Sequence, residues 1–316
     1  MAISDTNTVS QTSGLAEDFE DIINNISPTD TPLYTMAKKK KAAGRYHEWQ
    51  TDALEAAAAN AQAEGDDASF ATLAGTTTLG NYCQISRKTA QVSGTLETVK
   101  KYGRKSQMAY EMMKAGKALK RDIEYAIVRN QASASATARA TGGIECWISG
   151  NAQKNTGNTT FSVRGFASAS VVAPVDGTAT TFAEADLKTA LGLAWTDGGD
   201  PSVLMMSSTN KARFDNFAGI ATKYNEVKGT SQATVTGAAD MYVSSYGNHM
   251  VKLNRHMRDT TVLGLDPDYV SVAFLRPIQN KPLAETGDSQ KQMILAEYCL
   301  VVDNPDAHMQ VAGVGA

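Results

Sequence analysis

Two strand-like stretches of this chain are separated by a long loop, and this arrangement constrains the fold more than any other feature of the sequence. Side chains alternate in character over residues 44–54, with Arg45, His47 and Trp49 on one side, and they alternate again over residues 76–87. The alanine-rich stretch between them is more than twenty residues long. A two-stranded ribbon is marginally stable alone in water, and loops of this length are usually functional or bound to a partner. The sequence therefore predicts an exposed ribbon whose apolar side chains need a neighbour.

A long amphipathic helix is predicted over residues 106–133, because apolar side chains recur there every three or four residues. At 1.5 Å per residue, such a helix would be roughly 40 Å long. Its opposite face is expected to carry charged side chains. The apolar positions are Met108, Met112, Ala115, Leu119, Ile123, Ala126 and Ile127, and the charged positions are Lys114, Lys117, Arg121 and Glu124.

The remaining elements are shorter, and helices alternate with strands in the second half of the chain, which is typical of an α/β unit. Helical spacing over residues 15–26 ends at the prolines of residues 27–32, and residues 141–181 are expected to form loop and short strands. Helices are predicted at 182–195 and after a cap at Ser208, and strands at 89–99, 202–207, 241–245, 250–254, 262–265, 270–274 and 292–302, before a short tail.

Composition allows a large core and gives no sign of a dedicated nucleic-acid binder. Of the 316 residues, 42% are hydrophobic, and 30 basic and 33 acidic side chains give a formal net charge of −3. A protein devoted to nucleic acid is usually more basic, whereas low net charge suits self-association, because the copies repel one another only weakly. Cys83, Cys146 and Cys299 form no C-x-x-C pair, so we expect three reduced, mostly buried thiols.

Neither a signal peptide nor a membrane span is predicted. The first eighteen residues are polar, with no basic start and no apolar core. No apolar run approaches the roughly 20 residues that a membrane helix needs. We therefore expect a cytoplasmic product without membrane contact.

No pattern of catalytic or metal-binding residues is present in the sequence. The four histidines lie outside metal-binding and hydrolase motifs, and no glycine-rich phosphate loop occurs. Residues 64–67 (Glu-Gly-Asp-Asp) lack the alternating ligands of a calcium loop, so a solvated acidic turn is the favoured interpretation. We predict no catalytic residue, no cofactor, no metal site and hence no enzyme.

Charged blocks and aromatic side chains are the candidates for contact between subunits. We hypothesise that a run of lysines pairs with the acidic turn of another copy, where each exposed pair contributes little but a network sets register. The ribbon aromatics either anchor a neighbour or pack within the ribbon, and both interpretations stay open. The basic helix face either touches nucleic acid or is solvated with Glu124 as a local partner. The interface candidates are Lys38, Lys39, Lys40, Lys41, Tyr46, Trp49, Glu64, Asp66, Asp67 and Tyr82, and the basic-face candidates are Lys114, Lys117 and Arg121.

Seven short segments carry a resemblance to a known family through their order and number. They are Ser27–Pro32, His47–Asp52, Glu64–Ala68, Asn81–Ile85, Asn210-Lys211, Phe274–Pro277 and Glu285–Ser289. Together they resemble the major capsid proteins of tailed bacteriophages with the Hong Kong 97-type fold, and in particular one branch of phage major head proteins. The resemblance runs through nearly the whole chain and weakens over residues 141–181.

The resemblance implies an α+β fold, the Hong Kong 97-like capsid fold, with named parts. An N-terminal arm precedes an extended two-stranded loop, a peripheral domain that contains a spine helix, and an axial α/β domain. The closing strand and tail would return to the peripheral domain. On this chain the arm is 1–42, the extended loop 43–93, the peripheral domain 94–181 with its spine helix at about 106–133, the axial domain 182–290, and the closing strand and tail 291–316.

The family also implies a function and partners. The chain would assemble with itself into hexamers and pentamers that close an icosahedral shell around packaged double-stranded DNA. A portal protein, a separate scaffolding protein and in some cases a decoration protein would bind it, and its place would be the virion after assembly in the host cytoplasm. The basic helix face would line the inner surface, in weak and non-specific contact with DNA.

Two departures from the founding member of the family sharpen these expectations. In that member a lysine of the extended loop forms an isopeptide crosslink with a neighbouring asparagine, whereas no lysine lies between Lys41 and Lys88 here. A crosslink at the loop tip is therefore chemically impossible. The arm, of about forty residues, is too short for a large fused scaffold domain, so a separate scaffolding protein is expected. The alternatives are another self-assembling phage component, such as a tail tube or sheath protein, and an enzyme without a recognisable motif.

Overall fold

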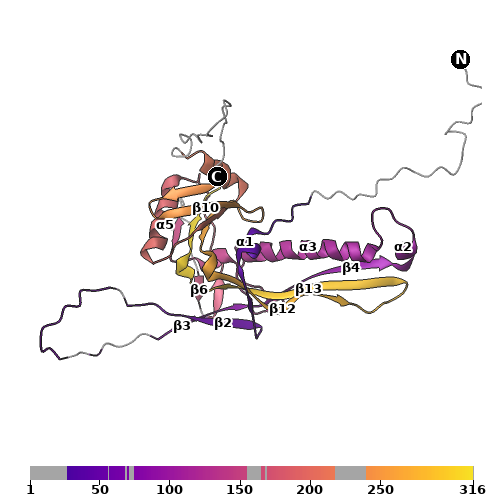
Figure 1. The fold of residues 1–316 in the computed structure, drawn as a ribbon, viewed down its shortest axis with the longest axis horizontal. Coiled ribbons are helices and arrows are strands. Elements are labelled where there is room, and N and C mark those ends of the chain that lie inside the picture. The colour runs from indigo at the N-terminus through magenta and orange to yellow at the C-terminus, as the bar shows by residue number, and fades with distance from the viewer. Residues whose placement is uncertain are drawn as a thin grey trace, which may run out of the picture.

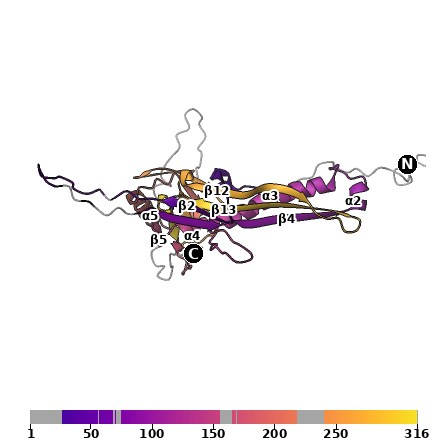
Figure 2. The same cartoon turned by 90° about the horizontal axis from the view of Figure 1, so that it is seen from below.

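A long four-stranded sheet and a long helix run side by side through one half of the molecule (Figure 1, Figure 2). The computed structural model describes residues 27–55, 57–67, 70, 75–154, 165–167, 169–217 and 240–315. Only the first strand of the sheet runs parallel to its neighbour. The strand order is β1 (Lys38–Lys41), β12 (Val270–Pro282), β13 (Ser289–Val302) and β4 (Gln84–Ser93), and the helix α3 (Gln107–Val128) lies against β4 and β13.

The predicted amphipathic helix is confirmed as α3. Its N-terminus is capped by Ser106, whose hydroxyl accepts a hydrogen bond from the amide of Ala109 at 3.1 Å. The predicted apolar stripe faces the interior, because Leu119, Ile123 and Ile127 are fully buried there. Burial of this stripe against the long sheet stabilises the helix far more than its intrinsic propensity does.

Six strands form a second, compact sheet in the other half of the molecule (Figure 1). The helices α5 (Glu184–Thr196) and α6 (Ser208–Asp215) pack against it, and their apolar side chains share one buried cluster with the sheet. The predicted alternation of helices and strands is thus confirmed in this half. The strand order is β5 (Ala152–Lys154), β14 (Met309–Ala312), β11 (Thr261–Leu265), β8 (Val203–Met206), β10 (Gly247–Leu253) and β9 (Met241–Ser244).

Shorter elements connect the two sheets and form the ribbon. The two ribbon strands pair only with each other, and β6 pairs only with β7. Within the described ranges, no helix is long and apolar enough to cross a membrane. These elements are α1 (Pro32–Met36), β2 (Tyr46–Thr51), β3 (Thr77–Tyr82), α2 (Gly94–Thr98), α4 (Ile144–Trp147), β6 (Gly165–Ala167), β7 (Ser170–Val172) and the short 3-10 turns η2 (Pro267–Tyr269) and η3 (Pro305–Ala307).

The expected division of the chain is wrong at three places. β4 lies in the segment assigned to the extended loop, but it pairs with β13 in the long sheet. The tail forms β14 inside the compact sheet, between β5 and β11, and does not return to the part that contains α3. All four residues of β14 are buried, so this strand lacks the alternation that marks a strand in sequence. β12 falls in the segment assigned to the axial domain, but it pairs with β13 in the long sheet. The register of β12 shifts on either side of Arg276, next to Pro277. Because of this irregularity, the sequence pattern does not show how far the strand extends.

Several local boundaries also differ from the predictions. The strand predicted to reach residue 99 ends at Ser93, whose hydroxyl accepts from the amide of Leu96 and begins α2 instead. The cap of α6 is Ser207 rather than Ser208. β10 begins at Gly247, where a turn was expected. The predicted helix at residues 15–26 lies outside the described residues.

The long helix also ends five residues earlier than predicted. It ends at Val128, and the chain beyond it leaves the helix to pair with other segments. The amide of Ser133 donates to the carbonyl of Val171 at 3.0 Å, and the backbones of Ala134 and Ala140 bond to each other. These tertiary hydrogen bonds replace the helical ones over residues that have helical spacing in the sequence.

Candidate assembly interface

The ribbon consists of a short paired root and a long loop that extends away from the body (Figure 1). Its strands pair antiparallel from Tyr46 opposite Tyr82 to Thr51 opposite Thr77. The loop therefore begins at residue 52 and ends at residue 76. The predicted two-stranded arm is confirmed, although only its root is hydrogen-bonded as a ribbon.

A buried asparagine fixes the root of the ribbon to the body. The Asn81 side chain is fully buried, and its amide nitrogen donates to Thr141 Oγ1 (3.1 Å) and to the carbonyls of Gly142 (3.2 Å) and Leu300 (2.7 Å). Its Oδ1 accepts from the amides of Gly142 (2.8 Å) and Tyr82 (2.9 Å). Every donor and acceptor of this side chain is thereby used, which makes the root a rigid part of the folded chain.

The ribbon aromatics pack within their own chain. The ring of Trp49 lies 5.3 Å from that of Trp147, which stacks in turn on Phe166 at 5.7 Å. Tyr46 and Tyr82 have ring centroids 4.6 Å apart, and the Tyr46 hydroxyl donates to a backbone carbonyl of the body. Of the two interpretations left open by the sequence, the structure favours packing at the root. The partners were missed because Trp147 and Phe166 lie in a segment that the sequence predicts as loop.

The acidic turn lies in the exposed loop. Gly65 adopts a φ of 86°, and the amide of Asp66 donates to the carbonyl of Ala63 at 3.2 Å, which closes the turn. The carboxylates of Glu64, Asp66 and Asp67 are exposed, and none forms an ion pair with a basic side chain in the described part of the chain.

Two large apolar side chains of the loop are also exposed. Leu54 is 98% exposed, and Phe70 is 99% exposed. Neither is covered by any described part of its own chain. The loop therefore presents the three carboxylates of its acidic turn and two large apolar groups to whatever lies beside it.

The lysine run does not lie on an extended arm, contrary to the expectation from sequence. It is the edge strand β1 of the long sheet, in parallel register with β12 from Lys38 opposite Ser271. Lys38 pairs with Asp268 at 2.7 Å, and Lys40 pairs with Asp303 at 2.6 Å. Two of the four ammonium groups thus have carboxylate partners in their own chain, and β12 holds the run by backbone pairing that no charge pattern reveals.

The other lysines of this strand differ in environment. Lys39 Nζ lies 3.6 Å from the ring centroid of Tyr34 and donates to the Tyr34 carbonyl. Burial lowers the pKa of Lys39 to about 8. Lys41 is exposed at the end of the strand.

The basic face of α3 is present, but Glu124, its expected local partner, does not lie on this face. Lys114 pairs with Glu111 at 3.3 Å, and Lys117 is exposed to solvent. Arg121 lines a hollow of about 360 Å³ with Asp122, His256 and neighbouring side chains. Lys114 and Lys117 therefore lie on the exposed side of the helix, whereas Arg121 is half-buried, and Glu124 does not lie beside them.

Glu124 is fully buried, so its predicted place on the solvated face is wrong. Its carboxylate accepts from the amides of Leu33 (2.9 Å) and Tyr34 (2.7 Å) at the start of α1, and from Asn254 Nδ2 (2.6 Å). Desolvation raises the pKa of Glu124. The side chain joins the end of the arm, the long helix and the loop after β10, and it lies at the edge of the apolar stripe, next to Ile123, where no sequence signal marks it as buried.

No metal-binding chemistry is indicated by the described side chains. No group of three or more histidine, cysteine, aspartate or glutamate side chains is placed to hold a metal ion within those ranges. The three cysteines are buried and unpaired, as predicted. Burial raises the pKa of Cys146 to about 12, so its thiol is not activated.

Comparison with known proteins gives one family. The profile described as SU10 major capsid protein matches residues 2–315. The curated major capsid protein of Escherichia phage Phieco32 is 37% identical over 115 residues, which are 36% of this chain. The matched region spans about a third of that relative's length (33%).

Solved structures with a similar fold cover almost the whole chain. The capsid asymmetric unit of Cyanophage A-1(L) has a TM-score of 0.70 at 12% identity, and covers 98% of this chain and 99% of that one. A structure from Mycobacterium phage Bobi has a TM-score of 0.61 at 11% identity, with the same coverage. A structure of the major capsid and decoration proteins of phage G has a TM-score of 0.53 at 10% identity and covers 99% of each chain. At identities this low, the likeness concerns the fold alone.

Proposed function

The chain belongs to the family of SU10 major capsid proteins, and from this premise we propose that its copies assemble as hexamers and pentamers into an icosahedral shell around double-stranded DNA. As a major capsid protein it builds the capsid of a phage and is a component of the virion. The similar solved structures include phage capsids, which confirms the predicted α+β, Hong Kong 97-type fold. The family is one of structural proteins, and this membership confirms the prediction that the chain is not an enzyme.

The observation that carries the proposal is the exposure of the ribbon loop. Leu54 and Phe70 are almost completely exposed, although burial of such a side chain contributes about 1.5–3 kcal/mol. The loop extends away from the body, so it has no surface of its own chain on which to bury them (Figure 1). A neighbouring copy supplies that surface in a closed shell. The division into arm (1–42), extended loop (43–93), peripheral part and axial part is kept as part of this proposal, with the corrections given above.

We infer that the shell forms without a lysine crosslink at the loop tip. The nearest lysines, Lys41 and Lys88, lie in β1 and β4 of the long sheet, outside the ribbon loop of residues 52–76. Buried area and ion pairs then hold the copies together. A denaturing mass spectrum of purified particles is expected to show the mass of a single chain. A ladder of covalently joined chains would contradict this inference.

The proposed partners follow from the same role. A portal protein, a separate scaffolding protein and in some particles a decoration protein are expected to bind the shell, which assembles in the host cytoplasm. The phage G structure contains decoration proteins beside its major capsid protein, and this supports only the last of these partners. Lys114, Lys117 and Arg121 on α3 are proposed to make weak, non-specific contacts with phosphates of the packaged DNA.

Electron microscopy of the purified protein tests the proposal. The chain is expressed alone and with a candidate scaffolding protein, and shells or ring-shaped capsomers are the expected result. The matched control replaces residues 53–75 by a short turn, which leaves the paired root and the body intact. This control should fold with an unchanged melting temperature and form no shells. A monodisperse monomer or dimer of the full chain under every condition would overturn the proposal and favour a tail component.

A further inference from the structure

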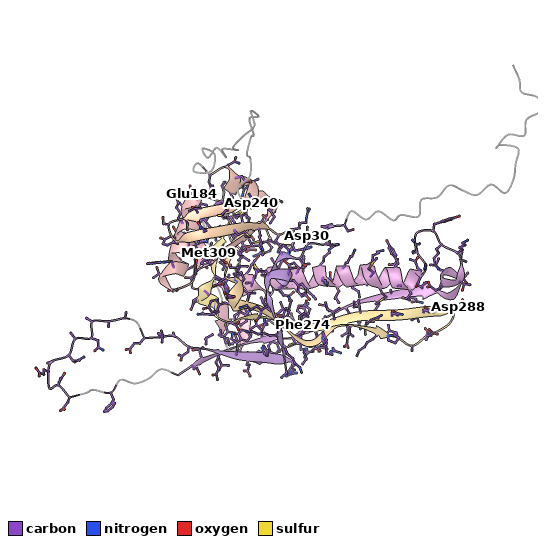
Figure 3. The ribbon with its side chains drawn as sticks, in the orientation of Figure 1. Asp30, Glu184, Asp240, Phe274, Asp288 and Met309 are labelled. Atoms are coloured by element: carbon purple, nitrogen blue, oxygen red, sulfur yellow. The ribbon has the colours of Figure 1, made fainter. Side chains whose placement is uncertain are left out.

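The two ends of the long axis of the molecule carry opposite charge. The ribbon loop with its acidic turn lies at one end, and α2 and the start of α3 lie at the other (Figure 1, Figure 2). Asp288, labelled in Figure 3, marks the hairpin between β12 and β13 at this second end. Because the two ends point in opposite directions, they cannot meet within one copy of the chain.

The connection between α2 and α3 is strongly basic. Residues 99–106, here called the basic loop, contain Lys100, Lys101, Arg104 and Lys105 and no acidic side chain. Lys101, Arg104 and Lys105 line a hollow of about 390 Å³ together with a glycine. The acidic side chains close to this end are Glu97 on α2, Glu111 near the start of α3 and those of the β12–β13 hairpin.

The cations of the basic loop differ in how far their own chain neutralises them. Lys101 Nζ lies 3.7 Å from the carboxylate of Glu97 and donates to the carbonyl of Leu96 at 2.6 Å. Arg104 lies over the ring of Tyr110, 5.4 Å from its centroid. Lys100 and Lys105 are exposed, and no carboxylate in the described ranges lies within ion-pair distance of either. The loop thus offers unneutralised positive charge.

The lysine run of β1 is a poorer match for the acidic turn. Two of its ammonium groups are already paired with Asp268 and Asp303, and the strand is backed by those carboxylates. A further acidic group brought to this strand would meet the negative charge that already neutralises it. In the basic loop, Lys101 pairs with Glu97 of α2, whereas Lys100 and Lys105 have no carboxylate partner among the described residues.

We propose that the basic loop of one copy binds the acidic turn, Glu64, Asp66 and Asp67, of the next copy. The contact joins different surfaces on the two partners, so each copy can give its turn to one neighbour and receive a turn from another. Contacts of this head-to-tail kind close rings when the rotation between copies is right. Charge complementarity of this type fixes partner and register, and it accelerates encounter at low salt. The proposal rests on the assembly of this chain into a shell and names the surfaces that carry the loop contact.

A disulfide-trapping experiment tests the contact directly. The native cysteines are buried, so engineered surface cysteines are the accessible thiols. Asp66→Cys and Lys105→Cys are combined in one chain, assembled particles are oxidised with copper phenanthroline, and a non-reducing gel is run. A reducible ladder of chain multiples is expected, because each copy would be joined to two others. Asp66→Cys combined with Lys120→Cys, an exposed lysine in the middle of α3, is the matched control.

Charge reversal gives a second, independent measurement. Lys100→Glu with Lys105→Glu should raise the protein concentration needed for half-maximal particle formation by roughly tenfold at low salt. Adding Glu64→Lys and Asp66→Lys should restore most of this loss. The control Lys120→Glu with Arg255→Glu changes net charge equally at exposed positions away from the basic loop and should assemble as the parent chain does.

Failure of the proposed function and failure of the proposed loop contact give different results. If the parent chain forms no particles, the proposed function fails. If particles form but the ladder is absent or equals that of the control, or if charge reversal leaves assembly unchanged, the basic loop is not the receiving surface.

Discussion

The root and the loop of the ribbon are parts of one hairpin, yet the root side chains are packed within their own chain and the loop side chains are exposed. At the root, Asn81 uses every donor and acceptor, and the ring of Trp49 packs against that of Trp147. In the loop, Leu54 and Phe70 are exposed and the acidic turn has no ion-pair partner among the described residues. The root therefore contributes to folding of the single chain, and the loop is left for contact with other copies. Folding of the single chain and contact between copies therefore depend on different residues.

The largest expected effect comes from breaking the root. Asn81→Leu removes five buried hydrogen bonds and leaves the Gly142 amide and the Leu300 carbonyl without their partner, so the free energy of unfolding should fall by about 3 kcal/mol. Urea unfolding of the unassembled chain measures this. Asn60→Ala, in the exposed loop, is the control and should change stability by less than about 0.5 kcal/mol. Equal effects at both positions would remove the distinction between root and loop.

Acid should weaken the body through a buried histidine. Burial lowers the pKa of His308 to about 4, below the usual value of roughly 6.5 in an unfolded chain. The unfolded chain therefore takes up the proton first, and the stability from this group is lost as the pH falls from about 6.5 to 4. Between pH 7 and pH 5 the loss should be about 2 kcal/mol.

Substitution of the same histidine isolates this effect. His308 Nδ1 accepts from the amide of Asp266 at 3.1 Å, and Asn in its place keeps an acceptor but does not titrate. His308→Asn should therefore show a flatter dependence of unfolding free energy on pH than the parent chain. Parallel pH profiles for the two chains would show that another group controls acid sensitivity.

In the loop, an apolar substitution should affect assembly and leave folding unchanged. Phe70→Ser should alter the unfolding free energy of the single chain by less than about 0.5 kcal/mol, because the ring is exposed. The concentration needed for half-maximal particle formation should rise roughly tenfold, since burial of the ring against a neighbour is lost. Light scattering at graded concentrations gives this value. Gln50→Ser, at an exposed root position, is the control.

The smallest effect is expected at the edge of the long sheet. Lys40→Ala removes an ion pair whose side chains are 41% and 30% exposed, so the stability lost should be about 0.5 kcal/mol and should disappear at high salt. Lys41 has no carboxylate within ion-pair distance in the described part of the chain, so Lys41→Ala serves as the control. A loss above about 1.5 kcal/mol at Lys40 would show that β1 depends on this pair for its position.

The ribbon and the long helix could be predicted from sequence because their signals are local. The apolar residues of α3 recur within one segment, and each ribbon strand alternates within one segment. The contacts of Asn81 with the body could not be predicted, because those partners lie 60 or more residues away in the chain. The same holds for Glu124, which accepts from the amide of a residue 91 positions earlier. A polar residue beside an apolar stripe has the same local pattern whether it is buried or solvated.

The edge strand made of four lysines has a consequence for misassembly. An open strand edge is a template for pairing with another sheet, which is the first step toward fibres and amorphous aggregates. At this edge, a second chain that tried to add a strand would bring its own backbone against a row of exposed ammonium groups. Sheet-on-sheet growth is therefore disfavoured on that side of the molecule. Copies of a capsid protein reach high local concentration during assembly. The lysines of β1 then disfavour fibre formation at one of the two edges of the long sheet.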